Sequence, residues 1–387
     1  MRRIFDSLLL TFIFSIPILT TVSSWLLFLL LIFSIFIRFL DLRRVNSIFR
    51  IWDIVLYLIV LVGGLIYSSD IKTGLSVLET SFSLVAIPIV FSCFSNFEKL
   101  KLDKITLSFA LGVFFSCSIC LVNALIEYNQ TGNTNVFFFY KLTAIINSHP
   151  TYLAYYLIFS ITLSLYLLYD QNSQLRPSVI IPFLLFFFAM LLLTGGYTAF
   201  ISLILVFSFF VLKFFIEDRT PPKRLTFILI LLMVATMFVV NSTRHNKMIL
   251  DDSWERFVLW ESAIKANPNL LFGVGTGDYK VEMNRYYQNH AMPQFANESY
   301  NSHNQFIQLF FSNGLIGLFA IALLVIRPLY LSYKSQNVFG ILILFPFLIY
   351  GVTEVFLGRY QGVVFFALLH QIFILQYDSQ QTKSVLN

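Results

Sequence analysis

The sequence predicts an all-α integral membrane protein with about twelve transmembrane helices and one long polar loop that contains short helices. The 387-residue chain is 58% hydrophobic and only 12% charged, whereas soluble domains carry about 25% charged residues. Apolar runs of about 20 residues, the length that crosses a bilayer as a helix, recur along the chain. Between the later runs lies the only long polar segment, from Asn241 to Gly317.

The apolar runs give the expected spans in chain order. The first run follows Met1-Arg2-Arg3 and resembles the start of a signal peptide. A second run begins at once without a small-residue cleavage site, so we expect a retained helix. Nine spans are expected in residues 1–241, a long loop in 242–302 and three spans in 303–387. The expected spans are 4–20, 22–40, 51–68, 74–94, 105–127, 149–169, 178–194, 197–216, 224–241, 303–327, 337–356 and 360–377.

The basic residues outside the spans predict the orientation of the chain. With the N-terminus in the cytoplasm, seventeen of the 26 Lys and Arg residues fall on the cytoplasmic side. The short loops on the other side contain only Lys72, Lys141 and Arg359. Basic residues favour the cytoplasmic side in short loops, so both termini are expected in the cytoplasm and the long loop outside. The net charge of +6 therefore indicates membrane topology rather than a nucleic-acid partner.

Neither a metal nor a cofactor is expected from the sequence. Cys93, Cys117 and Cys120 lie inside apolar segments, so we interpret them as small core residues rather than as disulfides or metal ligands. Asp251 and Asp252 resemble a pair of metal ligands, but they precede a predicted helix and capping is the favoured interpretation. The sequence contains no acidic cluster with ligand-like spacing and no nucleotide-binding motif.

The long loop begins with a predicted amphipathic helix. Asp251-Asp252-Ser253 are typical of a helix start, and Asn267-Pro268 of a helix stop. Between them, Phe257, Trp260 and Ile264 recur at helical spacing and form an apolar stripe suited to the membrane surface or to other spans. The loop contains further apolar residues, at Trp254, Leu270, Leu271 and Phe272. Because so many apolar side chains favour burial, we expect the loop to be folded.

Arg256 is the candidate anion-binding residue of this helix. It lies one turn before Trp260, so its guanidinium can stack on the indole while its N–H groups stay free for an anion. The alternative, which the sequence leaves open, is a surface ion pair with Glu255, Asp252 or Glu261.

The segment after the helix is rich in glycine, at Gly273, Gly275 and Gly277. This spacing permits tight turns and a close approach of backbone amide groups to an anion. The segment matches neither a P-loop nor a dinucleotide fingerprint, and its expected position outside the cytoplasm argues against a nucleotide.

The last motif is Asn301-Ser302-His303-Asn304-Gln305, at the mouth of the next span. An imidazole at a helix N-terminus can act as a general base, or as a donor to phosphate when it is protonated. The alternative role of these polar residues is helix capping, with Ser302 as the cap. Gly314 and Gly317 are expected to permit close helix packing. His149, at the start of the sixth span, is the nearest analogue, and for it a structural role is favoured over substrate binding.

Together these motifs resemble the O-antigen ligase and polymerase superfamily. The layout of spans, with the long loop between the ninth and the tenth, is similar as well. The resemblance implies a GT-C-like, membrane-embedded, inverting and metal-independent glycosyltransferase of the bacterial inner membrane. Such an enzyme moves a glycan from undecaprenyl diphosphate to a hydroxyl of a lipid or glycan acceptor on the periplasmic side. The segments that carry the resemblance are Arg256-Phe257-Val258-Leu259-Trp260, Gly273-Val274-Gly275-Thr276-Gly277-Asp278-Tyr279, Ser302-His303-Asn304-Gln305 and Gly314-Leu315-Ile316-Gly317.

The resemblance also implies roles for single residues. Arg256 matches the diphosphate-contacting arginine of the family, and His303 matches its essential histidine. The other candidates for substrate binding are Trp260, Gly273, Gly275, Gly277, Asn304, His149 and Arg285.

One segment departs from the pattern of the family. Many members carry a Ser-Arg pair at the outer end between the seventh and eighth spans, where this chain reads Thr194-Gly195-Gly196-Tyr197. Either Lys141, Arg244, Arg285 or Arg359 supplies a second cation for the donor, or this member of the family handles the donor differently.

Three functional alternatives remain beside the ligase. A polymerase of the same superfamily would accept a second lipid-linked repeat in place of a lipid A-core sugar. A transporter of polysaccharide or lipid is disfavoured because Asp53, Glu79 and Glu354 lie near span ends and no internal repeat is found. A structural scaffold protein would not need Arg256 and His303 at a shared interface.

Overall fold

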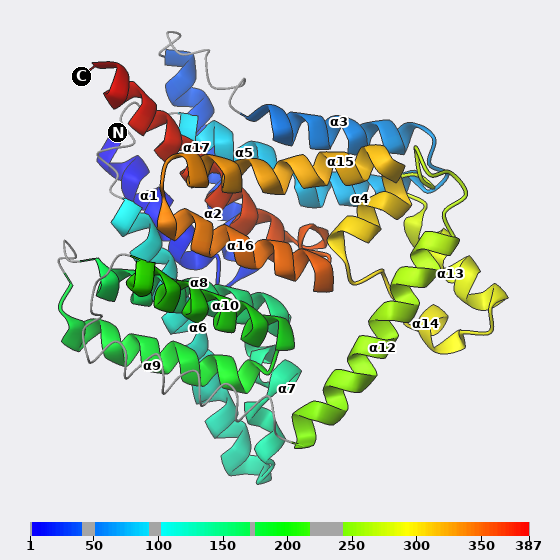
Figure 1. The fold of residues 1–387 in the computed structure, drawn as a ribbon, viewed down its shortest axis with the longest axis horizontal. Helices are drawn as coiled ribbons and strands as arrows, with labels where there is room; N and C mark the ends of the chain where they lie inside the picture. The colour runs from blue at the N-terminus through cyan, green and yellow to red at the C-terminus, as the bar shows by residue number, and fades with distance from the viewer. Residues whose placement is uncertain (1, 41–50, 93–101, 171–174, 217–242, 387) are drawn as a thin grey trace. The chain divides into compact units, whose positions relative to one another are not determined.

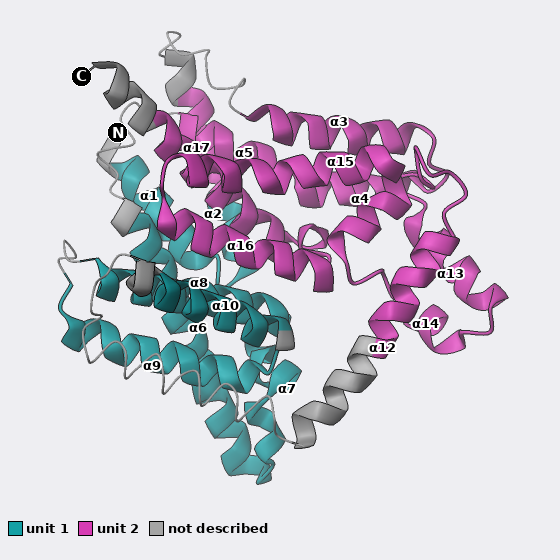
Figure 2. Cartoon of the chain, viewed as in Figure 1, with its two compact units in different colours: residues 1–26, 100–250 teal, residues 27–99, 251–387 magenta. Residues whose placement is uncertain are grey.

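The computed structural model describes residues 2–40, 51–92, 102–170, 175–216 and 243–386, which form helices and turns without a β-strand (Figure 1). The all-α prediction is therefore confirmed for the described residues. The chain divides into two compact units (Figure 2). Unit 1 comprises residues 1–26 and 100–250, and unit 2 comprises residues 27–99 and 251–387.

Unit 1 is organised around α8, whose side chains are buried over most of its length. This helix packs against α9 and also contacts α6 and α10. The helix α1 approaches α6 closely at Gly112, where a Cβ would lie 2.2 Å from the carbonyl oxygen of Phe14. The helices of unit 1 are α1 (Arg2–Ser15), α6 (Leu102–Thr131), η3 (Thr134–Phe137), α7 (Phe139–Thr143), η4 (Ala144–Ile146), α8 (Pro150–Tyr169), α9 (Pro177–Thr194) and α10 (Tyr197–Ile216).

Unit 2 is organised around α15, which packs against α3, α16 and α17. It contains the whole of the glycine-rich turn and of the segment around His303, so both motifs lie in one unit. Its helices are most of α2 (Thr20–Leu40), α3 (Trp52–Ile66), α4 (Ile71–Ser81), α5 (Ser83–Ser92), α12 (Thr243–Lys265) from Asp251 onwards, α13 (Tyr279–Asn289), α14 (Pro293–Asn297), α15 (Gln305–Lys334), α16 (Val338–Thr353), η5 (Phe356–Gly358) and α17 (Tyr360–Leu386).

The described helices occupy eleven of the twelve expected span ranges, and the remaining range, 224–241, lies outside the described residues. Further apolar helices of the described chain are shorter. These lengths and compositions agree with a multi-pass membrane protein, while the number of twelve spans stays a prediction. Within the described residues, the 6 helices that are long and apolar enough to cross a membrane are Ile71–Ser92, Lys104–Thr131, Pro150–Tyr169, Pro177–Thr194, Gln305–Lys334 and Tyr360–Asp378.

A buried ion cluster links α3, α15 and α17. Asp53 Oδ2 lies 2.7 Å from His370 Nε2, and Asp53 Oδ1 lies 2.5 Å from Arg327 Nη1. The Asp53 and His370 side chains are fully buried, and the Arg327 guanidinium lies over the ring of Trp52. Because a buried charge that loses its partner is strongly destabilising, the cluster holds α3 and α15, which carry part of the wall of the candidate site, together with α17.

The helix α12 differs from the sequence prediction at its start. It begins at Thr243 rather than at Asp251, and it ends at Lys265, just before the predicted stop at Asn267-Pro268. The prediction of the start was wrong because capping residues are also tolerated inside a helix, and the polar residues before Asp251 carry no strong helix breaker.

The apolar side chains of α12 are divided between two faces. Leu259 and Ala263 are buried in a cluster with residues of α13, α14 and α15. Trp254, Phe257 and, after the helix, Leu270 are 72%, 61% and 62% exposed, although the sequence favoured their burial. Exposed aromatic and aliphatic side chains of this kind suit a membrane interface, which is one of the two surroundings predicted for the stripe.

Candidate active site

The glycine-rich turn fits between α3 and α15. Gly273 and Gly275 have φ angles of +73° and +111°, which glycine adopts without the steric cost of a Cβ. The amide of Gly275 donates to the carbonyl oxygen of Ser312 at 2.8 Å, and that of Gly277 donates to Ser68 Oγ at 2.9 Å. The glycines therefore serve the close packing of the turn, and the amide groups that the sequence analysis associated with an anion have protein acceptors here.

Thr276, at the centre of the turn, joins the two helices. Its Oγ1 donates to the carbonyl oxygen of Leu61 at 2.8 Å and accepts from Asn313 Nδ2 at 2.9 Å. Gly64 makes this approach possible, since a Cβ there would lie 2.3 Å from Thr276 Oγ1. The turn is thus fixed to α3 and α15 by side-chain as well as backbone bonds, and Thr276 reaches the wall of the cavity described below.

Gly314 breaks the regular course of α15. Its φ and ψ are +63° and −156°, and a Cβ there would lie 2.2 Å from the carbonyl carbon of Leu271. The following amide, of Leu315, donates to the carbonyl oxygen of Leu270 at 2.8 Å. The sequence predicts close helix packing at this glycine, but its close neighbour in the structure is the segment that leads into the glycine-rich turn.

The start of α15 is capped by Asn304, not by Ser302. Asn304 Oδ1 accepts from the amides of Phe306 at 2.9 Å and Ile307 at 3.0 Å, as an N-cap side chain does. The Ser302 amide instead donates to Gln308 Oε1 at 3.3 Å, and its hydroxyl lies 2.9 Å from the carbonyl oxygen of Asn304 and 3.1 Å from Gln308 Oε1. Both residues therefore hold the segment before α15 in a fixed conformation around His303.

His303 is held beside an acidic residue that the sequence analysis had not connected with it. Its Nδ1 lies 3.6 Å from Glu354 Oε2, and the two side chains are 28% and 13% exposed. Its backbone is left-handed, with φ of +43°, and its amide donates to Asn301 Oδ1 at 2.8 Å. Non-glycine residues in this conformation are uncommon and cluster at functional sites. The left-handed backbone and the acidic partner therefore make His303 a candidate acid–base residue.

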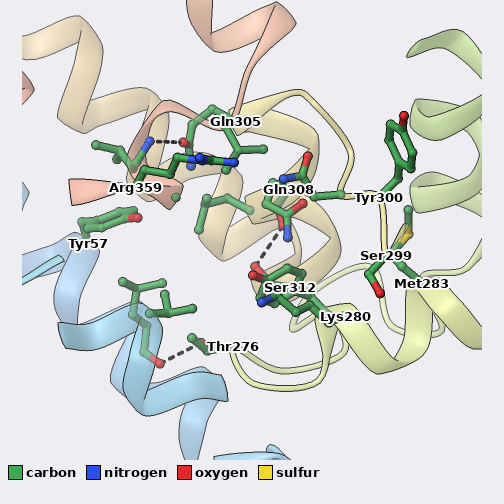
Figure 3. Close-up of a pocket in the computed structure, with 18 residues that line it drawn as sticks. Tyr57, Thr276, Lys280, Met283, Ser299, Tyr300, Gln305, Gln308, Ser312 and Arg359 are labelled. Carbon is green, nitrogen blue, oxygen red and sulfur yellow. Dashed lines mark hydrogen bonds between the residues drawn. The ribbon is translucent and has the colours of Figure 1, made fainter. Parts of the chain in front are cut away.

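A cavity of about 280 Å³ lies next to this pair, within unit 2 (Figure 3). Asn301 and Gln305, on either side of His303 in the sequence, line it, as does Val355, which follows Glu354. The cavity wall combines α3, α4, the glycine-rich turn, α13, the segment before α15, α15 itself and the connection from α16 to α17. Its lining residues are Tyr57, Leu61, Val77, Thr276, Tyr279, Lys280, Met283, Ser299, Tyr300, Asn301, Gln305, Gln308, Leu309, Ser312, Val355, Leu357, Gly358 and Arg359.

The charged groups of the cavity are cationic. Lys280 and Arg359 line it, both exposed, and none of the described residues in its wall is Asp or Glu. Lys280 Nζ lies 5.9 Å from the ring centroid of Tyr279. Burial raises the pKa of the Tyr279 hydroxyl above its ordinary value, so this group stays protonated at neutral pH and can donate a hydrogen bond. The cavity is therefore suited to a ligand that accepts hydrogen bonds and carries negative charge.

Arg256 and Trp260 lie on α12 and are not part of the cavity wall. Arg256 is partly exposed and has no ion-pair partner among the described side chains. Glu261, one of its three predicted alternatives, pairs with Lys265 at 2.6 Å. The Trp260 ring makes an edge contact with Phe257 at a centroid distance of 5.3 Å, and its buried Nε1 has no hydrogen-bond partner. The side chain of Asp252, another of these alternatives, lies outside the described residues. Among the described side chains, the guanidinium of Arg256 is available for an anion.

The four residues proposed to supply a second cation have different surroundings. Arg285 pairs with Glu282 on α13, with Nη1 2.7 and 2.9 Å from the two carboxylate oxygens. Lys141 is exposed in unit 1, and the side chain of Arg244 lies outside the described residues. Arg359 lines the cavity, and it is the candidate that the geometry favours.

His149 belongs to unit 1, and both of its ring nitrogens make hydrogen bonds. Its Nδ1 accepts from the amide of Thr151 at 3.3 Å, which caps α8, and its Nε2 lies 2.7 Å from Tyr140 Oη. Because Nδ1 accepts, the neutral ring carries its proton on Nε2 and donates to Tyr140. His149 therefore has a structural role at the start of α8, and substrate binding by it stays a prediction.

Comparison with known proteins gives two similarities. Residues 182–322 match a family model described as O-antigen ligase. A stretch of 124 residues is 25% identical to an uncharacterised protein of Haemophilus influenzae, covering 29% of this chain and 31% of that relative. The chain thus matches about a third of the length of this relative. The family match includes the motif helix, the glycine-rich turn and the segment around His303.

Proposed function

Since residues 182–322 match the O-antigen ligase family and so support membership of the O-antigen ligase and polymerase superfamily, we propose that this multi-pass membrane protein is a ligase-type glycosyltransferase. It moves a glycan from undecaprenyl diphosphate to a hydroxyl of lipid A-core or an equivalent acceptor, on the periplasmic face of the bacterial inner membrane. The observation that carries the proposal is the pair of His303 and Glu354 beside a cavity whose charged groups are cationic.

His303 acts as the general base. With Nδ1 facing Glu354, its Nε2 is the nitrogen that accepts the proton of the acceptor hydroxyl. The acceptor oxygen then forms a bond to the anomeric carbon of the donor sugar, while the bond from that carbon to the diphosphate oxygen breaks. The attack comes from the face opposite the diphosphate, so the anomeric configuration inverts. Glu354 stabilises the imidazolium that results.

Arg256 stabilises the leaving diphosphate. Negative charge develops on the departing oxygen, and a positioned cation is the protein group that lowers the energy of such a transition state. The planar guanidinium binds two phosphate oxygens at once and keeps its charge at a membrane interface, which an ammonium does less reliably. Arg256 is free of ion pairs within the described side chains, so binding the donor does not require an existing contact to break.

A glycan-transfer assay tests the proposal. The protein in lipid nanodiscs receives the lipid-linked glycan donor and the lipid A-core acceptor, and the product is measured per folded molecule. His303→Ala should lower the rate by about 100- to 10,000-fold, the usual contribution of a general base. Transfer should continue in EDTA because the cations of the chain, rather than a metal ion, stabilise the leaving group. If chelation abolished transfer and magnesium restored it, the proposal that the reaction needs no metal ion would be refuted.

The surface histidine His290 provides the matched control. It is exposed on the C-terminal end of α13, where its ring stacks on Tyr286, and His290→Ala should transfer normally. Near-normal transfer by His303→Ala would show that His303 is not the general base. Elongation of the donor glycan without any lipid A-core acceptor would identify the protein as a polymerase instead.

A further inference from the structure

Three side-chain amides in the cavity wall share one orientation. Asn301, Gln305 and Gln308 all line the cavity, and the oxygen of each amide is held by a backbone N–H group. An amide oxygen accepts, whereas an amide nitrogen only donates, so these bonds determine which end of each amide remains for a ligand. The bonds run from Leu357 N–H to Gln305 Oε1 at 2.8 Å, from His303 N–H to Asn301 Oδ1 at 2.8 Å and from Ser302 N–H to Gln308 Oε1 at 3.3 Å.

The nitrogen ends of these amides are left as donors. Gln305 and Gln308 are only 1% and 6% exposed, and within the described structure neither Nε2 donates to a protein acceptor. The two Nε2 atoms have no protein partner in the described structure, yet they do not belong to the polar atoms that are fully enclosed without one. Both nitrogens are therefore accessible from the cavity and can donate to a hydrogen-bond acceptor that enters it.

Two cations complete this donor surface. Lys280 lies on α13 and Arg359 in the connection from η5 to α17, and neither forms an ion pair with a described residue. The wall thus offers the amide nitrogens of Gln305 and Gln308, an ammonium and a guanidinium, and none of its described residues carries a carboxylate. Tyr57, Tyr279 and Tyr300 add aromatic rings to the wall, and the apolar face of an aromatic ring is suited to pack against the C–H groups of a sugar.

We propose that this cavity is a subsite for a sugar unit that carries an oxyanion, either a phosphate or a carboxylate. Arg359 and Lys280 bind the oxyanion, and the amides of Gln305 and Gln308 donate to it or to ring hydroxyls. The volume of about 280 Å³ lies at the small end of ligand pockets and suits one monosaccharide unit rather than a long glycan. The inference rests on the proposed function only in taking the ligand to be part of a glycan.

The oxyanion has two sources within a lipid-linked glycan. It is the phosphate on the first sugar of the donor, or the carboxylate of an acidic sugar in the glycan or the acceptor. The two differ in where the anion lies on the ring, at the anomeric carbon or at C6. Glucose 1-phosphate and glucuronate represent the two sources, and glucose is the neutral reference.

Calorimetric titration of the purified full-length protein with these three sugars tests the proposal. At least one anionic sugar should bind, and glucose should bind at least ten times more weakly. Arg359→Ala should weaken binding of the anionic sugar by about 10- to 100-fold, the usual effect of a charged hydrogen bond. Gln305→Glu should abolish binding of the anionic sugar. One carboxylate oxygen of the new side chain still accepts from the Leu357 amide, while the other places a negative charge where the wild type has an N–H donor.

Matched variants outside the cavity are the controls. Lys265→Ala also removes one positive charge, and Gln288→Glu also replaces an amide by a carboxylate, both at exposed positions of unit 2. Both should bind the anionic sugars as the wild type does. Thermal unfolding of each variant without ligand establishes that the cavity variants are folded, and Gln305→Glu keeps the test decisive should Arg359→Ala not fold.

Each outcome bears on the subsite separately from the reaction. Preference for glucose 1-phosphate identifies the donor as the source, and preference for glucuronate identifies an acidic sugar. Equal binding of glucose, no binding of either anionic sugar, or unchanged binding by both cavity variants would overturn the subsite, even with glycan transfer intact. Conversely, selective binding of an anionic sugar together with normal transfer by His303→Ala would refute the proposed catalytic role and leave the subsite standing.

Discussion

Replacing Glu354 with Gln removes the charge beside His303 and keeps the shape of the side chain. Two unit charges 4 Å apart interact by about 1 kcal/mol in water and about 4 kcal/mol at an effective dielectric constant of 20. The His303 and Glu354 side chains are 3.6 Å apart and 28% and 13% exposed, so screening by solvent holds the interaction near the lower end. We expect a loss of about 1–2 kcal/mol in stabilisation of the imidazolium, which is a rate reduction of about 5- to 30-fold.

The assay is the rate of glycan transfer per folded molecule for Glu354→Gln, His303→Ala and the double variant. If Glu354 acts only through His303, the double variant should be no slower than His303→Ala, because residues that act as a unit are not additive. Glu298→Gln, at an exposed carboxylate just after α14, should transfer normally. Wild-type rates for Glu354→Gln, or a double variant that loses the product of the two single effects, would refute the coupling.

Three further predictions concern other parts of unit 2. Arg256→Lys keeps the charge but loses the bidentate guanidinium, so transfer should fall to a small fraction while the amount of folded protein stays normal; a fully active variant would contradict the role of Arg256. A cysteine placed at Asn289 should react with a membrane-impermeant thiol reagent without permeabilisation of the inner membrane, and reaction only after permeabilisation would reverse the expected topology. Gly277→Ala should lower stability by about 1–3 kcal/mol, because its Cβ would lie 2.0 Å from the carbonyl oxygen of Asp70; an unchanged thermal unfolding midpoint would show that the backbone can move away.

The positions of the helices were predictable because the bilayer sets their length. A run of apolar residues must be about 20 residues long to cross the membrane, and this constraint finds the helices without knowledge of their packing. The same constraint locates the ends of the helices less accurately. The predicted span 74–94 is divided at Phe82 into α4 and α5, and α12 begins before its predicted cap. Neither difference changes the apolar pattern, so composition alone could not reveal it.

The candidate site was predictable only where its residues are close in the sequence. The segment around His303 and the glycine-rich turn carry local motifs, whereas Glu354 belongs to the connection between α16 and η5, and no spacing rule relates it to His303. The direction of an amide is likewise invisible in the sequence. Gln305 and Gln308 could be identified as polar residues at the start of a span, but the backbone groups that hold their oxygens come from Leu357 and Ser302.

The ion cluster of Asp53 constrains the order in which this protein can be completed. Arg327 is 274 residues further along the chain, so at about 5–20 residues per second it is synthesised about 14 to 55 seconds after Asp53. Until then Asp53 lacks the partners that it has in the folded protein, and a buried charge without its partner is strongly destabilising. The contacts that fix the first turn of α3 therefore form only after α15 and α17 have left the ribosome, and the cavity wall that α3 carries is among the last parts of the protein to be held in place.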